Sequence, residues 1–185
     1  MTNLDWEFSG RVLAGSFIRD VVWQLLEKSG YVVLPYGYEV SAPFVRQLPF
    51  VRQRLSTSST KSQILDRFRC SPDILVIDEP KEELSLVEVK WRNWSQPYID
   101  ASYLALSKYK RYWPETILAL VVPARNYFYA QYVAKLRPGR GRYKLATSFK
   151  KIEKVFPRIT KESISQFRVV IDRYVAATDV KGAER

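Results

Sequence analysis

The chain has no histidine and only one cysteine among its 185 residues. Without histidine it cannot build a Ser-His-Asp or Cys-His catalytic arrangement, a histidine-based metalloprotease site or a Cys-His zinc finger. Cys70 alone can form neither an internal disulfide nor a thiolate metal site, which favours a reducing compartment. Any bound metal is therefore expected to have mainly oxygen ligands, as Mg²⁺ and Mn²⁺ prefer.

Long hydrophobic runs are absent as well. The first ten residues contain Asp5 and Glu7 and no apolar run of the signal-peptide type, and no later window approaches the length of a membrane span. We therefore expect a cytoplasmic protein with no membrane partner, either prokaryotic or encoded by a virus or mobile element in a host cytoplasm.

Positive charge is what the chain has in excess. Thirty Lys and Arg against nineteen Asp and Glu leave a formal net charge of +11, in a chain that is still 46% hydrophobic. This balance predicts a folded protein with a polyanionic partner, since a disordered basic tail would be much less apolar. The surplus is concentrated at 43–69 and 137–158.

The length suits one domain, expected over 1–178 with a core at 11–123, a basic segment at 124–178 and a disordered tail at 179–185. Hydrophobic periodicity and turn signals then predict an α/β arrangement. The expected elements are a helix at 11–29, a strand at 31–35, a hairpin of strands at 71–78 and 84–91, a helix at 98–112, a doubly buried strand at 116–122 and a last helix opened by Ser163 and Gln166.

Residues 43–61 contain a near-duplication, Pro-Phe-Val-Arg-Gln-Leu followed by Pro-Phe-Val-Arg-Gln-Arg, that runs into a Ser/Thr tract. The prolines argue against a helix or a central strand and favour an exposed loop. Two interpretations stand side by side. The repeat is either a tolerated duplication in a loop, or a mobile arm whose Arg46, Arg52 and Arg54 contact phosphates.

The residues with the clearest chemistry lie on the expected hairpin. Asp73 follows Pro72 at the start of one strand, and Glu88 and Lys90 lie in the middle of the next. Residues two apart on a strand share a face, and Asp73 can lie beside them across the hairpin. Two carboxylates with the carbonyl of Val89 form a hard oxygen site for a divalent cation, and Lys90 can neutralise charge developing on phosphorus or help to position and deprotonate a water.

This pattern of Pro72-Asp73 followed by Glu88-Val89-Lys90 resembles the PD-(D/E)XK nuclease superfamily, which includes the Holliday-junction resolvases. The resemblance covers roughly 11–123. It implies a restriction-endonuclease-like fold, with a central mixed four-stranded sheet flanked by helices in the order α-βββ-α-β. It also implies that Asp73 and Glu88 are metal ligands, that Lys90 is the catalytic lysine, and that Mg²⁺, or Mn²⁺ in its place, is the cofactor.

The family usually adds an acid on the first helix, and here the sequence departs from the pattern. The position where we expect glutamate holds Arg19. Asp20 is the candidate for the missing acid, while Glu27 and Glu39 are alternatives. An ordinary solvated helix face explains Asp20 and Glu27 equally well, and the loss of this acid would put a second metal or activity itself in question.

Basic and aromatic residues around these positions are candidates for contacts with nucleic acid. They are Arg46, Arg52, Arg54, Arg92, Trp94, Lys108, Arg111, Arg140 and Arg142. A solvated basic helix explains Lys108 and Arg111 as well as a phosphate-contacting face does.

The sequence thus favours a Mg²⁺-dependent endodeoxyribonuclease, either of the junction-resolvase type, which would be dimeric, or of a nicking or restriction type. The alternatives are a nucleic-acid-binding protein with a degenerate site on the same fold, and an RNA-binding or RNA-processing module, because phosphate contacts do not separate DNA from RNA.

Overall fold

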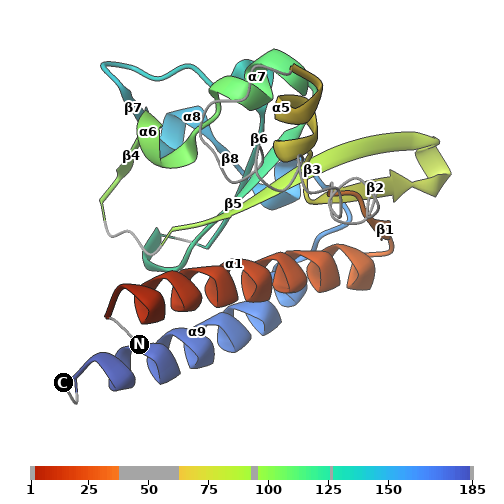
Figure 1. Ribbon diagram of the computed structural model, residues 1–185. Helices are drawn as coiled ribbons and strands as arrows, with labels where there is room; N and C mark the ends of the chain where they lie inside the picture. Colours follow the sequence, from red (N-terminus) through yellow and green to blue (C-terminus); the bar gives the residue numbers. More distant parts are fainter. Residues whose placement is uncertain (1–2, 38–62, 93–95, 126, 184–185) are drawn as a thin grey trace.

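The computed structural model describes residues 3–37, 63–92, 96–125 and 127–183 (Figure 1). The repeated segment at 43–61, with Arg46, Arg52 and Arg54, and Trp94 lie outside these ranges.

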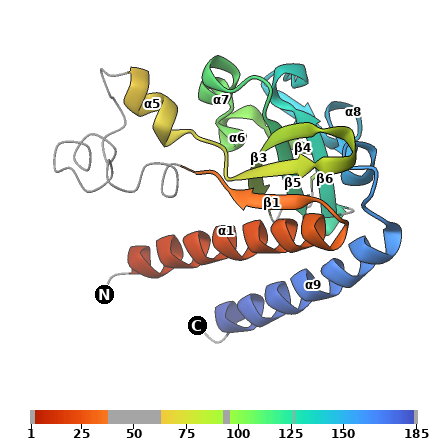
Figure 2. The same cartoon turned by 90° about the vertical axis from the view of Figure 1, so that its right-hand side faces the viewer.

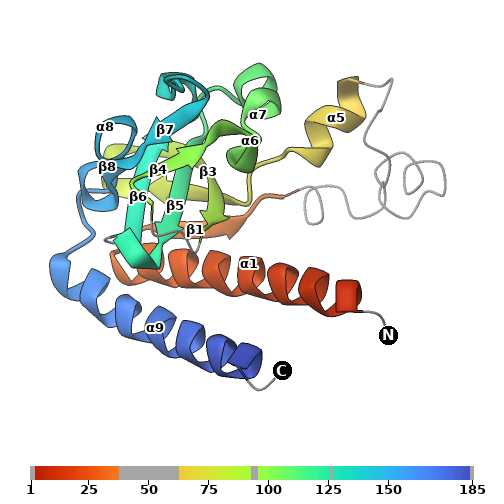
Figure 3. The ribbon, with the colours of Figure 1, turned by 90° about the vertical axis from the view of Figure 1, so that its left-hand side faces the viewer.

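A mixed sheet of six strands forms the centre of the molecule (Figures 1 and 3). Its order is β1-β2-β3-β5-β6-β8, and all neighbours are antiparallel except β3 and β5, which are parallel. The strands are β1 Val32–Pro35, β2 Ile74–Asp78, β3 Glu83–Trp91, β5 Ile117–Val122, β6 Tyr127–Tyr132 and β8 Lys150–Lys151.

The mixed sheet was expected, but with four strands. The four expected strands are neighbours in the order β1-β2-β3-β5, and β6 and β8 extend the sheet beyond β5. Both additional strands come from the basic C-terminal segment, so this segment is part of the sheet layer. Because β5 is apolar on both faces and along its full length, a strand on its outer side also protects its backbone polar groups.

The hairpin of β2 and β3 is confirmed, with a register running from Ile74 opposite Val87 to Asp78 opposite Glu83. The short 3₁₀ helix η1 Glu79–Lys81 makes the turn, and Glu82 closes it in the left-handed region at φ 54°. Along β2 buried and half-buried side chains alternate, which is the period-2 pattern of a strand between two different layers.

Two long helices cover one face of the sheet. These are α1 Asn3–Lys28 and α9 Lys161–Ala183, which run in opposite directions side by side (Figures 1 and 2). The buried stripe of α1 consists of Ile18, Val21, Val22, Leu25 and Leu26. Their helical spacing turns one face of α1 towards the sheet, as the sequence predicted, although α1 begins before residue 11.

The last helix differs from its prediction at both ends. Its N-cap is Thr160, whose side-chain oxygen accepts a hydrogen bond from the amide of Ser163 at 3.2 Å. Ser163 therefore lies inside the first turn, and the helix continues through 179–183, where a frayed tail was expected. Phe167 and Ile171 on its inner face are buried, whereas Val170 is exposed.

The opposite face of the sheet carries short elements. They are α5 Gln63–Arg69, α6 Ala101–Leu104, α7 Ser107–Tyr112, α8 Leu145–Ser148, the two-stranded sheet of β4 Tyr98–Asp100 and β7 Arg142–Lys144, and the 3₁₀ turn η3 Val133–Lys135. Two further 3₁₀ turns, η2 Pro123–Arg125 and η4 Ile152–Lys154, belong to the side of α1 and α9. The single helix expected at 98–112 is wrong. Its first residues pair with β7, and Ala105, in the left-handed region at φ 48°, separates α6 from α7.

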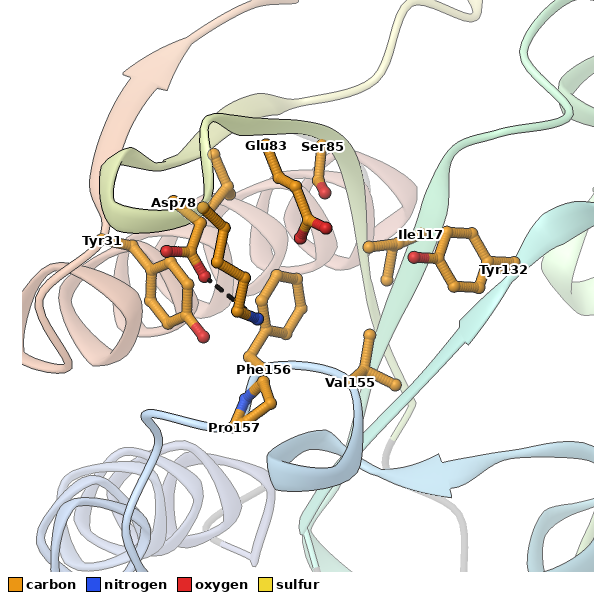
Figure 4. Close-up of a pocket in the computed structure, with 11 residues that line it drawn as sticks. Tyr31, Asp78, Glu83, Ser85, Ile117, Tyr132, Val155, Phe156 and Pro157 are labelled. Carbon is orange, nitrogen blue, oxygen red and sulfur yellow. Dashed lines mark ion pairs between the residues drawn. The ribbon is translucent and has the colours of Figure 1, made fainter.

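A charged cluster ties the far end of the hairpin to the long helices. The buried carboxylate of Asp78 accepts hydrogen bonds from Arg158, whose guanidinium also donates to the carbonyl of Gly30 and lies 4.6 Å from the centre of the Tyr31 ring. Lys81 adds a second cation at 3.4 Å from Asp78 (Figure 4). One buried carboxylate thus links β2, the end of α1 and the segment before α9.

Across the described ranges, none of the helices combines the length and the apolar character that crossing a bilayer requires.

Candidate active site

The site is built where β2 begins and β3 runs beside it. Asp73 directly precedes β2, and its carbonyl accepts hydrogen bonds from the amides of Tyr36 (3.1 Å) and Gly37 (3.3 Å) at the end of β1. Its side chain accepts a hydrogen bond of 2.8 Å from the amide of Val89 on β3. Main chain and side chain of Asp73 are therefore held by two neighbouring strands.

Glu88 and Lys90 point to the same face of β3, whereas Val87, Val89 and Trp91 pack into the core beneath α1, as the alternation predicted. Glu88 is only 4% exposed, because the short elements on this face close over it. The ammonium of Lys90 pairs with its carboxylate. The Asp73 carboxyl lies close enough to Glu88 for the two groups to shift each other's pKa.

Burial and mutual repulsion dominate the electrostatics of the two carboxyls. Burial raises the pKa of Glu88 to about 7, and the negative charge of Asp73 raises it further. Lys90 and the Tyr109 hydroxyl act in the other direction and lower it. Burial also raises the pKa of Asp73, although the Val89 amide, Lys90 and Arg19 oppose it. Two carboxyls in contact cannot both ionise easily, so without a further cation they retain a proton between them near neutral pH.

Tyr109 is a site residue that is not among the candidate site residues predicted from the sequence. It is buried on α7, its hydroxyl hydrogen-bonds Glu88, and the Lys90 ammonium lies 5.5 Å from the centre of its ring. Periodicity marked it as an apolar helix position and its basic neighbours suggested a phosphate-contacting face. Neither signal connects it with a carboxylate on β3.

On the first helix, Arg19 and Asp20 differ in their relation to the site. The positive charge of Arg19 acts on Asp73, whereas the side chain of Asp20 is 64% exposed and lies 3.8 Å from the Arg19 guanidinium. Glu27 is exposed as well. Within the part of the chain that the structure describes, no three Asp, Glu, Cys or His side chains come close enough together to hold a metal ion. Glu39 lies outside that part.

The candidate nucleic-acid contacts that are described have different surroundings. Arg92 follows β3 and donates to the carbonyls of Trp91 and Tyr103, while its Nε is buried without a partner. Lys108 pairs with Asp66 of α5 at 2.8 Å.

Arg111 is exposed on α7, with its guanidinium 5.1 Å from the centre of the Tyr112 ring. Arg142 on β7 pairs with Asp100 at 2.9 Å, and Arg140 is exposed in the loop just before it. Two of these residues, Lys108 and Arg111, lie on the helix that also carries Tyr109.

No protein-family model matches the chain, and no curated protein sequence is similar to it. Among solved structures, one match is a Holliday junction resolvase from the archaeal hyperthermophile Archaeoglobus fulgidus. The TM-score is 0.43 and the identity 15%, over 77% of this chain and 94% of that chain. A likeness of this degree carries no functional argument, so the proposals below depend on the residues of the site.

The raised pKa of Glu88 predicts how stability depends on pH. Between pH about 4.5 and about 7 the folded protein keeps a proton that the unfolded chain has lost, so the free energy of unfolding falls as the pH rises. Glu88→Gln has no carboxyl that titrates in this range, so it should not lose this part of its stability. Between pH about 5 and pH about 8, the free energy of unfolding of the metal-free variant should therefore fall by on the order of 3 kcal/mol less than that of the wild type.

Urea unfolding with a chelator at both pH values measures this difference. Glu79→Gln, in the exposed turn of the same hairpin, serves as the control and should change with pH as the wild type does. Equal pH dependence of Glu88→Gln and wild type would contradict the burial of a titrating carboxyl.

Proposed function

We propose that the chain is a metal-dependent DNA nuclease that hydrolyses phosphodiester bonds. The observation that carries the proposal is the convergence of two carboxyls and a lysine across adjacent strands: Asp73 is held by the amide of Val89, next to Glu88, and Glu88 is paired with Lys90. In the reaction, the oxygen of a water forms a bond to phosphorus and the bond from phosphorus to one sugar oxygen breaks. The net charge of +11 suits a polyanionic substrate.

The two carboxyls suit a hard divalent cation. Glu88 is buried and Asp73 half-buried, they repel one another, and one lysine is the only cation in hydrogen-bond contact with them among the described residues. Asp73 and Glu88 would hold the ion, and the carbonyl of Val89 is the third candidate ligand. When bound, Mg²⁺ or Mn²⁺ supplies positive charge to the phosphodiester and makes a water more acidic.

Lys90 has a separate role in this proposal. Its ammonium stands beside the carboxylate pair on the same face of β3, where the phosphate of a substrate would approach. A fixed positive charge there stabilises the negative charge that develops on the phosphate oxygens in the transition state. The positive charge of Arg19 also acts on Asp73.

The DNA backbone would lie along α7 and the β4–β7 region. Lys108, Arg111, Arg140 and Arg142 belong to these elements, and Arg92 leaves β3 beside them. Contacts from such residues are with phosphates, so they position the backbone and leave sequence preference open. Trp94 and the arginines of the repeated segment remain candidates on sequence grounds.

A nucleic-acid-binding protein without cleavage activity is the second candidate. It is favoured by the basic Arg19 at the position of the expected first-helix acid, and by the two-carboxylate composition of the described site. An RNA-directed version of either function has the same electrostatic support, because phosphate contacts are common to both nucleic acids.

A dimer, expected of a junction resolvase, has a suitable surface on the sheet. Six aliphatic side chains form two rows across β1, β2 and β3 on the face that also carries Glu88. The rows are Val32, Ile77 and Leu84, and Leu34, Leu75 and Leu86. Leu84 is 67% exposed and Leu34 43% exposed, which is unusual for neighbouring aliphatic residues in a soluble sheet.

We place the contact with a second copy of the chain on these two rows. Glu83 and Glu115 line the hollow at their border, together with Leu84 and Leu86, so a DNA backbone would be repelled there.

The first prediction concerns cleavage. Asp73→Asn and Glu88→Gln should each lower the cleavage rate in Mg²⁺ by at least about a thousandfold, because each removes one of two charged ligands, while DNA affinity stays within about threefold. Single-turnover cleavage of labelled DNA and a filter-binding assay measure the two effects. Glu79→Gln is the matched control. Unchanged cleavage by both site variants would refute the assignment.

The role of Asp20 can be separated in the same assay. Asp20→Asn should cleave at the wild-type rate, since its side chain is exposed and paired with Arg19. If Asp20→Asn lowered the cleavage rate as much as Asp73→Asn, Asp20 would be the first-helix acid of the active site. Salt-dependent DNA binding by the wild type, with no cleavage in Mg²⁺ or Mn²⁺, would select the second candidate function.

The second prediction concerns substrate structure. We expect a four-way junction to be cleaved faster than nicked duplex, flap or single-stranded DNA of the same sequence, as a junction resolvase requires. Parallel time courses on the four substrates decide between this and a nicking or restriction type. Competition by matched RNA duplex, if as strong as competition by DNA, would favour the RNA-directed alternative.

The third prediction concerns the dimer. Leu34→Lys combined with Leu84→Lys should convert a dimer into a monomer, because two buried charges would face each other across the interface. Sedimentation equilibrium measures the mass. Val170→Lys, which changes a 44% exposed aliphatic residue on α9, is the control. A wild-type monomer, or equal masses for both variants, would refute this surface.

A further inference from the structure

Tyr109 connects the two reactive side chains of β3 with the layer of short elements above them. Its hydroxyl lies close enough to Glu88 to act on the carboxylate as a hydrogen-bond donor, and its ring lies beneath the ammonium of Lys90 at 5.5 Å from the ring centre. Lys90 in turn pairs with Glu88. The three side chains therefore form a closed set of contacts, in which each one touches the other two.

The helix that carries Tyr109 is anchored on both sides. The Lys108 ammonium pairs with Asp66 of α5 at 2.8 Å, and the Lys110 ammonium donates to the carbonyl of Leu136 at 2.7 Å. At the end of α7 the amide of Trp113 donates to the carbonyl of Tyr109 itself at 2.7 Å. The tyrosine is thus presented from a backbone that three separate contacts hold in place.

Each contact of Tyr109 restricts a motion that would matter for the site. A glutamate carboxylate turns freely about its last bond, and a hydrogen bond from a fixed hydroxyl selects one orientation of its two oxygens. A lysine ammonium on a flexible stem is attracted to the face of an aromatic ring, so here the ring and the Glu88 carboxylate together fix the position of the ammonium. Packing alone would be satisfied by a phenylalanine or a leucine at this position.

We infer that Tyr109 is a positioning residue, whose hydroxyl orients the Glu88 carboxylate towards a divalent cation and whose ring holds the Lys90 ammonium beside the carboxylate pair. The inference rests on the proposed nuclease function. It assigns the two effects to different parts of one side chain, so two substitutions separate them.

Tyr109→Phe removes the hydroxyl and keeps the ring, whereas Tyr109→Leu removes both. Tyr143→Phe is the matched control, since Tyr143 is buried in the same core cluster and has a lysine, Lys110, 5.9 Å from its ring centre. Mn²⁺ affinity is measured by the paramagnetic resonance signal of free Mn²⁺, and the cleavage rate at saturating Mn²⁺ by single turnover.

We expect Tyr109→Phe to weaken Mn²⁺ binding by about tenfold, with a smaller effect on the saturated rate, because the hydroxyl acts through Glu88. Tyr109→Leu should bind Mn²⁺ as weakly as Tyr109→Phe and lower the saturated rate by about a further tenfold, because Lys90 has lost its ring. Tyr143→Phe should leave both quantities at the wild-type values.

The outcomes separate this inference from the proposal beneath it. A wild type that neither binds Mn²⁺ nor cleaves DNA refutes both. A wild type that does both, with Tyr109→Phe indistinguishable from Tyr143→Phe in Mn²⁺ affinity, refutes the role of the hydroxyl alone. Should Tyr109→Leu fail to fold, the comparison of the two phenylalanine variants still decides, since both keep the ring and the core volume.

Discussion

The requirement to cover both faces of β5 shapes the rest of the molecule. All six residues from Ile117 to Val122 are buried, so apolar layers are needed on each side of the sheet. α1 and α9 supply one layer, and the short elements from α5 to α8 supply the other. Because β3 is the parallel neighbour of β5, the second layer also closes over the face of β3 that carries Glu88.

This burial creates the chemical character of the site. A glutamate on an open sheet face would stay ionised and solvated, whereas beneath α5 and α7 its pKa rises to about 7 and it meets Asp73, Lys90 and Tyr109 at contact distance. The free energy lost by burying a carboxyl pair is offset elsewhere in the fold, and a bound cation would recover part of it. Buried carboxyls that lower stability in this way are typical of functional sites and are seldom found where a residue serves stability alone.

The distribution of charge around the sheet separates two surfaces. Basic residues gather on α7, the helix of Tyr109, and around β7, whereas acidic residues gather at the turn between β2 and β3 and at Glu115. The hairpin continues past the short elements, as Figure 1 shows, and exposes aliphatic residues next to these acids. A polyanion and a protein partner would therefore meet different parts of one sheet face.

Strand residues were predictable because their period is 2. Once 71–78 and 84–91 were recognised as a hairpin, alternation alone placed Glu88 and Lys90 on one face and Val87, Val89 and Trp91 on the other. The doubly buried strand at 116–122 followed from its unbroken apolar run in the same way. Helix α1 was predictable as an element, but not in its rotation, because each residue turns the helix by about 100°. Packing against the sheet therefore turns Arg19, and not its neighbour Asp20, towards Asp73.

By itself, then, the sequence determined the hairpin, the pairing of Asp73 with the face of Glu88 and Lys90, and the excess of positive charge, since all three depend on local periodicity and composition. Only the tertiary structure decided the break at Ala105, the addition of β6 and β8 to the sheet, and the arrival of Tyr109 over Glu88. These depend on contacts between segments far apart in the chain. In such contacts the burial of apolar faces outweighs local helix propensity. The pattern within a single segment therefore does not show which distant segment it will pack against.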